Sequence, residues 1–327
     1  MNETALPSKM QGLWLENMKL SMRRDIICHR PGPGEALIRV RLAGICQTDL
    51  ELRKGYYPFA GIPGHEFVGR IVLAPDRPSW EGKRVVGEIN CVCGNCSLCS
   101  QGLPHHCLER TVLGIVGRNG AFAEYLILPL TNLHPIPDAL SDEKAVFTEP
   151  LAAALQILEQ VQIGQDQKVL LIGAGKLGQL IARVLLLTGC ALSVVARHES
   201  QASLLSQLEL LLVDEKELPN KHFDIVVEAS GAPQGLESAR LAVRPAGTIV
   251  LKSTYEGKSV VDLSSLVVDE ITLVGSRCGP FPAAIDLLER DVIDPTPLIS
   301  ETRSFCEATE AFDRASESGV LKILIQL

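Results

Sequence analysis

Hydrophobic and polar positions follow two different periodic patterns along this chain. Up to about residue 135, apolar residues alternate over short runs such as "EALIRVRLAGI" and "FVGRIVLA", and groups such as "RPGPGE" and "FAGIPGHE" separate the runs. Alternating runs rich in β-branched residues and bounded by glycine and proline are typical of strands. The first part of the chain is therefore predicted to be β-rich.

The second pattern follows "SDEKAVF", where acidic residues in the first turn indicate a helix start, although Lys144 makes a poor capping box with Ser141. From Lys168 the pattern predicts a buried strand in "KVLLIGAG", a helix in "KLGQLIARVLLLTG" and a strand in "ALSVVAR". Three further strands are predicted in "FDIVVEASG", "GTIVLKST" and "ITLVGS". Strands that alternate with helices predict a parallel, doubly wound sheet. The end of the chain predicts two amphipathic helices and a strand that can pair back into the N-terminal β region.

Composition and charge limit the classes of protein to which this chain can belong. The 327 residues suggest two domains, and 46% apolar residues are enough for a large core. A net charge of −8 argues against a nucleic-acid or anionic-membrane partner. No apolar run approaches the roughly 18 residues of a membrane span. The charged N-terminal stretch has no signal-peptide core, so we expect a cytoplasmic protein, in which clustered cysteines more often bind metal than form disulfides.

The segment "GAGKLG" has the G-x-G-x-x-G spacing between a predicted strand and a predicted helix. Gly173 permits the tight turn, Gly175 lets the backbone approach a pyrophosphate, and Gly178 lets the helix pack closely on the sheet. The segment therefore predicts dinucleotide binding; the alternative is a turn that merely tolerates glycine. The candidate cofactor contacts are Gly173, Gly175, Lys176, Leu177, Gly178, Arg197, Ser230 and Ser253.

Arg197 predicts which nicotinamide cofactor is preferred. An acidic residue about 20 positions after the glycines usually holds the ribose 2′-hydroxyl of NAD. In "SVVARHES" that region carries Arg197, and the first acid is Glu199. Because an arginine can clamp a 2′-phosphate, we predict a preference for NADP(H) over NAD(H). The alternatives are an exposed arginine without a role, or Glu199 reaching the ribose.

Half of the ten cysteines lie in "CVCGNCSLCSQGLPHHC", residues 91–107. Four of them have a spacing that can close a tetrahedral structural zinc site: Cys93, Cys96, Cys99 and Cys107. Cys91 is then one too many, and the two histidines are interpreted as part of the loop. Disulfides, free thiols and a nucleic-acid zinc module are the alternatives, and the last is disfavoured because the loop contains no lysine or arginine.

A second group of residues has the composition of a catalytic metal site. Cys46 and Thr48 lie in "GICQTD", His65 and Glu66 lie in "GHEFVG", and Glu149 lies in "FTEPLAAAL". A thiolate, an imidazole and a carboxylate can hold zinc as a Lewis acid and leave one position open. Each residue alone has an ordinary structural explanation, and the hypothesis depends on their joint occurrence.

These motifs, together with "GAFAEY" and in this order, resemble the zinc-dependent members of the medium-chain dehydrogenase/reductase superfamily, the group of alcohol, sorbitol and threonine dehydrogenases. The resemblance covers essentially the whole chain. It implies an α/β fold in which a β-rich GroES-like catalytic domain spans residues 1–150 and includes the structural-zinc loop at 91–107. A Rossmann domain then spans residues 151–280, and residues 281–327 return to the catalytic domain.

The resemblance also implies roles for the second group of residues. Cys46 and His65 would ligate the catalytic zinc, with Glu66 beside it as a ligand or exchangeable ligand. Glu149 occupies a position where liver-type alcohol dehydrogenases carry a cysteine and sorbitol and threonine dehydrogenases carry a glutamate. The chain therefore resembles the polyol-oxidising members of the family. Thr48 would begin the proton relay.

Two positions depart from the family pattern. Gln47 replaces a basic residue near the pyrophosphate, and Glu51 replaces the histidine that ends the relay in liver-type enzymes. Glu51 or water would then receive the proton that Thr48 passes on.

The resemblance predicts an oxidoreductase that transfers a hydride between a small alcohol or polyol, or its carbonyl, and NADP(H) or NAD(H). Zinc would lower the pKa of the alcohol, Thr48 would accept its proton, and two zinc ions would bind per chain. We also expect a homo-oligomer, either a dimer or a tetramer. The alternatives are a zinc-free quinone or enone reductase of the same superfamily, and a non-enzymatic nucleotide-binding protein.

Overall fold

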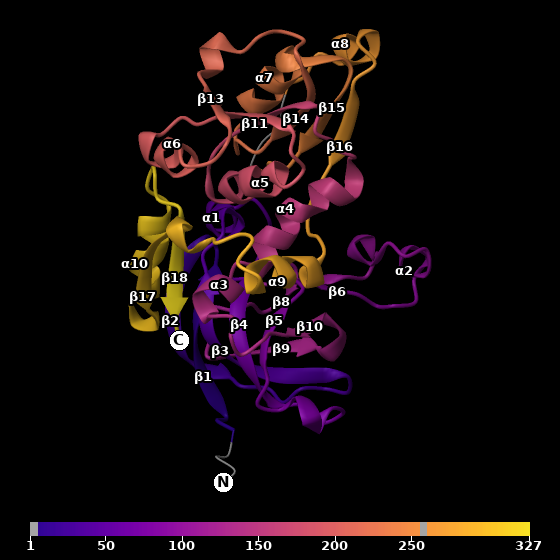
Figure 1. The fold of residues 1–327 in the computed structure, drawn as a ribbon. Helices are drawn as coiled ribbons and strands as arrows, with labels where there is room; N and C mark the ends of the chain where they lie inside the picture. Colours follow the sequence, from indigo (N-terminus) through magenta and orange to yellow (C-terminus); the bar gives the residue numbers. More distant parts are fainter. Residues whose placement is uncertain (1–5, 256–259) are drawn as a thin grey trace. The chain divides into compact units, whose positions relative to one another are not determined.

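The computed structural model describes residues 6–255 and 260–327, and the chain divides into two compact units (Figure 1). The first unit contains the chain up to Glu149, together with Leu288–Arg290 and Ile299–Leu327. The second contains Pro150–Leu287 and Asp291–Leu298. The sequence places the return to the first unit at residue 281, whereas this division places it at Leu288, with a short excursion back into the second unit.

The first unit is built on a seven-stranded sheet with the order β10-β5-β4-β3-β18-β17, in which β9 also pairs with β3. Its strands are β3 (Glu35–Gly44), β4 (Glu66–Leu73), β5 (Arg84–Gly87), β9 (Tyr125–Pro129), β10 (Leu133–Pro135), β17 (Ile299–Ser304) and β18 (Lys322–Gln326). The alternating runs in "EALIRVRLAGI" and "FVGRIVLA" become β3 and β4, so these two predicted strands are confirmed. The C-terminal strand β18 pairs antiparallel with β3. Segments from opposite ends of the chain therefore meet in one sheet.

Smaller elements complete the first unit. An N-terminal hairpin joins β1 (Lys9–Glu16) to β2 (Lys19–Ile27). A three-stranded sheet contains β6 (Asn90–Cys91), β7 (Thr111–Leu113) and β8 (Gly117–Arg118), and the cysteine loop lies between β6 and β7. The helices are α1 (Gln47–Lys54), α2 (Ser97–Ser100), α3 (Asp142–Ala145) and α10 (Ala308–Ala315), and α4 (Thr148–Gln160) begins at the end of the unit. Ser141 Oγ caps α3 by accepting a hydrogen bond from Lys144 N at 3.3 Å, so the predicted helix start is confirmed.

The second unit contains a six-stranded parallel sheet with the order β13-β12-β11-β14-β15-β16. Its strands are β11 (Lys168–Ile172), β12 (Ala191–Val195), β13 (Leu211–Val213), β14 (Phe223–Glu228), β15 (Val243–Leu251) and β16 (Thr272–Gly275). Its further helices are α5 (Lys176–Leu186), α6 (Glu199–Leu205), α7 (Gln234–Ala242), α8 (Leu263–Val268) and α9 (Phe281–Glu289). The predicted parallel, doubly wound sheet is confirmed. Its strand order reverses between β11 and β14, the position at which such sheets bind nucleotides.

Apolar side chains on the strands form the core of the second unit. Leu170, Ile172, Val226 and Ile249 are all buried in it, and Ala239 of α7 packs among them. These strands are buried on both faces, which explains why their sequences are continuous apolar runs. In the described part of the chain, no helix has both the length and the apolar composition that crossing a membrane requires.

Candidate active site and metal centres

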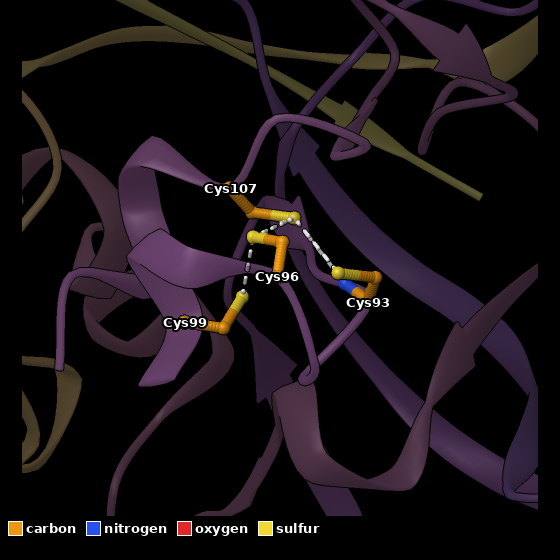
Figure 2. Close-up of side chains that lie close together, drawn as sticks. All are labelled: Cys93, Cys96, Cys99 and Cys107. Atoms are coloured by element: carbon orange, nitrogen blue, oxygen red, sulfur yellow. Dashed lines mark hydrogen bonds between the residues drawn. The ribbon is translucent and has the colours of Figure 1, made fainter. Parts of the chain in front are cut away.

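The four predicted structural ligands lie together in the loop between β6 and β7, and we call Cys93, Cys96, Cys99 and Cys107 the loop cluster (Figure 2). Neighbouring sulfur atoms are 3.5 to 3.8 Å apart. Four thiolates bound tetrahedrally to one zinc ion at about 2.3 Å would have their sulfurs about 3.8 Å apart. The loop cluster therefore fits a closed zinc site.

The thiols of the loop cluster differ in proton affinity. Backbone N–H groups of Cys99 and Leu108 lower the pKa of Cys96 to about 6. Burial, followed by the nearby Cys96 sulfur, raises the pKa of Cys99 to about 12. A divalent ion bound among the four sulfurs would favour the thiolate form of all four. Cys91 does not belong to the cluster. It lies in β6 and pairs with Thr111 of β7, and burial raises its pKa.

The second group also forms a cluster, and we call Cys46, His65 and Glu66 the buried cluster. Cys46 is the N-cap of α1, and His65 immediately precedes Glu66, the first residue of β4. One ligand atom from each residue lies within 4.8 Å of the others. Only 3% of the surface of His65 and 1% of that of Glu66 is exposed.

Asp49 supports this cluster, although it is not among the residues predicted from the sequence to form the site. Its carboxylate is fully buried; Oδ2 accepts a hydrogen bond from Cys46 N at 2.8 Å and Oδ1 accepts one from Gly64 N at 3.2 Å. Oδ1 also lies 3.4 Å from His65 Nδ1, which leaves Nε2 as the ring nitrogen available to a metal. The position of Asp49 three residues after the N-cap, where acids often cap helices, was the signal that could have identified it.

The charges around His65 suit a cation. Burial lowers the pKa of His65, but Asp49 and Cys46 beside the ring raise it by more, so the pKa lies well above its ordinary value. A metal ion bound to the imidazole would replace the proton that these charges attract.

Lys322 is the second residue that sequence reasoning missed. Its Nζ donates a hydrogen bond of 2.5 Å to Glu66 Oε2, and both side chains are almost fully buried. Burial lowers the pKa of Lys322, but the charges of Glu66 and Cys46 raise it by more, so the net shift is upward. A lysine in the buried strand "KILIQ" was the signal that could have identified it.

The other carboxylate oxygen, Glu66 Oε1, is buried and has no hydrogen-bond partner among the described residues. An unpartnered buried oxygen is costly unless something else binds it. Together with a thiol and an imidazole, it forms the mixed donor set that zinc accepts in catalytic sites. The buried cluster therefore fits a zinc ion.

Thr48 and Glu149 lie near these residues without joining the cluster of ligand atoms. The Cys46 thiol donates a weak hydrogen bond to Thr48 Oγ1 at 3.8 Å. Glu149 is half-buried in the first turn of α4, and its charge acts on Lys322. Glu51, the expected exit of the relay, accepts hydrogen bonds of 2.9 Å from both Gln47 and Lys54.

The predicted cofactor residues lie at the carboxyl ends of the parallel strands of the second unit. Gly173 follows β11 with φ +106°, and a Cβ there would lie 2.6 Å from Ala229 O. A Cβ on Gly178 would overlap Gly173 O, so the start of α5 packs directly against this turn. A Cβ on Gly175 would meet nothing within 4 Å. The turn is therefore closely packed at Gly173 and Gly178 but open at Gly175, where a phosphate could approach the backbone.

The remaining candidate cofactor contacts extend this edge of the sheet. Lys176 and Leu177 form the first turn of α5. Ser230 follows β14, where Glu228 Oε1 accepts hydrogen bonds from its N and Oγ at 2.8 and 2.6 Å. Ser253 follows β15, and its Oγ accepts a hydrogen bond from Gly231 N at 2.8 Å. This hydrogen bond links the loop after β14 to the loop after β15.

Arg197 lies just past the end of β12, and Val195 O accepts a hydrogen bond from Gly173 N at 3.2 Å. The arginine is therefore close to the glycine turn. Its guanidinium forms a two-point ion pair with Glu215 at 3.1 to 3.3 Å. The guanidinium that was predicted to bind a 2′-phosphate is therefore paired with a carboxylate in this structure.

Comparison with known proteins connects both units to dehydrogenases. The family model for the alcohol dehydrogenase GroES-like domain matches residues 32–138, and the model for zinc-binding dehydrogenases matches residues 177–290. The chain is 30% identical to D-arabinitol dehydrogenase 1 of Uromyces fabae, over 98% of each protein.

Two solved structures are similar over nearly the whole chain. One is the RspB protein of Escherichia coli CFT073, described as a short-chain alcohol dehydrogenase and solved with NADH; it has a TM-score of 0.90, is 28% identical, and the match covers 98% of this chain and 100% of that one. The other is a zinc-binding dehydrogenase of Sinorhizobium meliloti 1021 bound to NADP, with a TM-score of 0.89, 27% identity and the same coverage.

Proposed function

This chain belongs to the zinc-dependent medium-chain dehydrogenase/reductase superfamily of alcohol and polyol dehydrogenases, and we propose that the buried cluster is its catalytic site. The protein is an NAD(P)-linked oxidoreductase that acts on alcohols or polyols, or on the corresponding carbonyls. The observation that carries the proposal is the buried, unpartnered Glu66 Oε1 beside Cys46 and His65. The zinc-free reductase and the non-enzymatic protein lose support because the ligands of both clusters are present.

In the proposed mechanism Cys46 and His65 hold the metal, with Glu66 as an exchangeable ligand. A bound zinc ion supplies Lewis-acid chemistry that lowers the pKa of the substrate hydroxyl. The hydroxyl of Thr48 accepts the proton from the substrate and passes it to Glu51 or to water. Asp49 keeps the imidazole of His65 oriented through Nδ1. The glycine turn, Ser230 and Ser253 hold the cofactor that exchanges the hydride.

The experiment that tests this function is a substrate panel. Primary alcohols, polyols and hydroxy acids are each tried with NAD⁺ and NADP⁺, using protein as purified, protein dialysed against a chelator, and dialysed protein with zinc restored. We expect turnover of at least one alcohol or polyol, loss of turnover after dialysis and its recovery with zinc. Turnover that is unaffected by metal removal would contradict the assignment.

We propose two zinc ions per chain, one in each cluster. The sulfur spacing of the loop cluster supports the first, and the mixed donors of the buried cluster support the second. Ligand sets of this kind require cysteines that are reduced and can lose their protons. The reducing environment of the cytoplasm, the location that we also propose, keeps cysteines reduced. Metal analysis of protein purified without chelator should give two zinc ions per chain, and one would contradict the proposal.

Glu149 is proposed to act on the catalytic metal and to favour polyol substrates. Its charge reaches Lys322, so it belongs to the electrostatic environment of the buried cluster. Glu149→Ala should weaken zinc retention or reduce turnover, whereas Glu149→Cys should keep zinc. Glu143→Ala, which removes an exposed acid from the first turn of α3, is the matched control. Parental zinc affinity and rate in Glu149→Ala would restrict Glu149 to a structural role.

We propose a preference for NADP(H), supported by the position of Arg197 after β12 and near the glycine turn. A 2′-phosphate would compete with Glu215 for the guanidinium. Each charge-assisted hydrogen bond is worth about 1.5–3 kcal/mol, or roughly 10- to 150-fold in selectivity. The parent should favour NADP⁺ by kcat/KM, and Arg197→Asp should lower or reverse that ratio. Glu215→Gln should raise the ratio by freeing the arginine.

A control keeps this test specific. Arg244 forms a similar ion pair with Asp224, but at the amino end of the sheet, so Arg244→Ala should leave the cofactor ratio unchanged. A parent that prefers NAD⁺, or a ratio that Arg197→Asp does not move, would refute the NADP preference.

We propose that the chain forms a homo-oligomer through the outer edge of β16. In the described part of the chain, β16 ends the six-stranded sheet. Exposed apolar residues gather on and near it: Leu263, Val267, Val268 and Leu273. A second copy could extend the sheet and cover these side chains. Val267→Glu combined with Val268→Glu should reduce the mass measured in solution, and an unchanged oligomer would exclude this edge.

A further inference from the structure

Gly44 lies at a point where three strands meet beside the buried cluster. In the sheet of the first unit, Gly44 of β3 pairs with Glu66 of β4 on one side and with Leu324 of β18 on the other. A Cβ on Gly44 would overlap Glu66 Oε2 and would lie 3.4 Å from Lys322 Cδ. Because Gly44 has no side chain, the space above β3 stays open at this point. The side chain of Lys322 crosses that space to reach Glu66.

Lys322 is a buried cation that faces negative groups from several elements. Its Nζ donates to Glu66 Oε2 at 2.5 Å, and the charges of Cys46 and Glu149 also act on it. Nζ lies 5.7 Å from the centre of the Phe147 ring. Only 3% of the lysine is exposed, so water screens these interactions weakly.

The two carboxylate oxygens of Glu66 have different surroundings. Lys322 engages Oε2, while Oε1 has no hydrogen-bond partner among the described residues. A carboxylate that is free on both oxygens can chelate a metal with both, whereas one that is held by an ammonium group through one oxygen binds a metal more readily through the other. Lys322 therefore holds Oε2, and Oε1 is the oxygen that is available to a metal ion.

We infer that Lys322 is a positioning residue that limits Glu66 to a single, releasable bond with the metal and so keeps one metal position open for substrate. The inference rests on the proposed function, because it takes the buried cluster as the catalytic zinc site. Lys322 acts in two ways. It occupies Oε2, and its positive charge opposes a second cation in the same buried space.

A purely structural role for Lys322 makes the opposite prediction. If the lysine only stabilised the fold, its loss would loosen the buried cluster, and zinc would leave faster. If Lys322 restrains Glu66, its loss frees both carboxylate oxygens and removes a repelling charge, and zinc would leave more slowly. The direction of the change in zinc release therefore separates the two roles.

The test uses Lys322→Met, which keeps an unbranched side chain that is one atom shorter and removes the charge. We expect zinc release from the buried cluster to a chelator to slow about tenfold and kcat to fall about tenfold or more, the scale on which outer-shell partners act. In protein with cobalt in place of the catalytic zinc, the visible absorption should weaken as the metal gains a ligand. Lys322→Arg, which keeps a donor and a charge, should restore the parental spectrum and release rate.

Two further variants keep the inference falsifiable if Lys322→Met folds poorly. Gly44→Ala should push the carboxylate off Lys322 and change the cobalt spectrum and zinc release in the same direction, by a smaller factor. Adding Glu66→Gln to Lys322→Met removes the freed chelator and should bring the cobalt absorption back up. Lys221→Met, which breaks a surface ion pair with Asp269, is the control for loss of an ion pair alone.

The outcomes separate the inference from the proposed function. Faster zinc release in Lys322→Met, or parental cobalt spectra in both Lys322→Met and Gly44→Ala, would overturn the role of Lys322. A parent protein that holds no metal at Cys46, or a fully active Cys46→Ser, would instead overturn the proposed catalytic site.

Discussion

The loop cluster takes all four sulfurs from residues 93–107, whereas the buried cluster takes one residue from the start of α1 and two from the start of β4. Three of the four loop cysteines are half-buried, and their contacts lie largely within the loop. His65 and Glu66 are almost fully buried, and each is engaged by a further buried charged residue, Asp49 and Lys322.

The difference follows from the charges that each cluster must accommodate. Four thiolates around one divalent cation form a closed set that requires only correct spacing and some access to water. A site with mixed donors and an open position places unlike charges in a low-dielectric interior, where an unpaired charge is costly. The surrounding fold must then provide counter-charges. The four predictions below test this contrast, from the largest expected effect to the smallest.

Cys46→Ser should produce the largest effect. Removing a metal ligand should cut kcat/KM by more than the roughly 10- to 100-fold that loss of an outer-shell partner costs. Zinc content should fall from two per chain to one, while the melting temperature should stay near that of the parent. Cys306→Ser, which changes an exposed cysteine, is the control. Appreciable turnover in Cys46→Ser would show that the buried cluster does not carry the chemistry.

Cys99→Ser should affect stability rather than catalysis. The loop should lose its zinc and the folding energy that the metal supplies, and the melting temperature should fall by several degrees. Calorimetry and metal analysis measure both effects, and kcat of the folded fraction should remain close to the parental value. Two zinc ions and an unchanged melting temperature would contradict a structural role for the loop cluster.

Asp49→Asn should weaken the buried cluster without dismantling it. Asparagine keeps the shape and one acceptor, but it loses the charge that faces His65. We expect a loss of about 10- to 100-fold in zinc affinity or kcat, and full retention of the loop zinc. Asp313→Asn, at an exposed ion pair with Arg53, controls for removal of a charge. Equal losses at both metal sites would mean that Asp49 acts on the fold as a whole.

Cys91→Ala should have the smallest effect. This residue is the fifth cysteine near the loop, but its sulfur lies outside the cluster of four. We expect two zinc ions, parental kcat/KM and a loss of about 1 kcal/mol in the free energy of unfolding from the smaller buried side chain. Loss of the loop zinc in this variant would show that the ligands had been assigned to the wrong four cysteines.

Periodicity predicted the larger strands but missed elements whose pattern is weak. The runs that became β11, β12 and β14 are continuous and apolar, because both faces of the sheet are covered. β13 has only three residues, and although all three are apolar, the run is shorter than the four to eight residues from which a strand is predicted. The hairpin of β1 and β2 turns at Asn17 and Met18, both with positive φ, and no glycine marks the turn.

The candidate sites also differ in whether a local pattern in the sequence predicts them. The sequence by itself determined the loop cluster and the glycine turn, because their residues lie a few positions apart and local backbone geometry brings them together. Only the tertiary structure paired Lys322 with Glu66, which are 256 positions apart in the chain. That pairing depends on the registers of β4 and β18 on either side of β3, and on the space above Gly44. Register between distant strands is set by the packing of the whole sheet, and no local spacing records it.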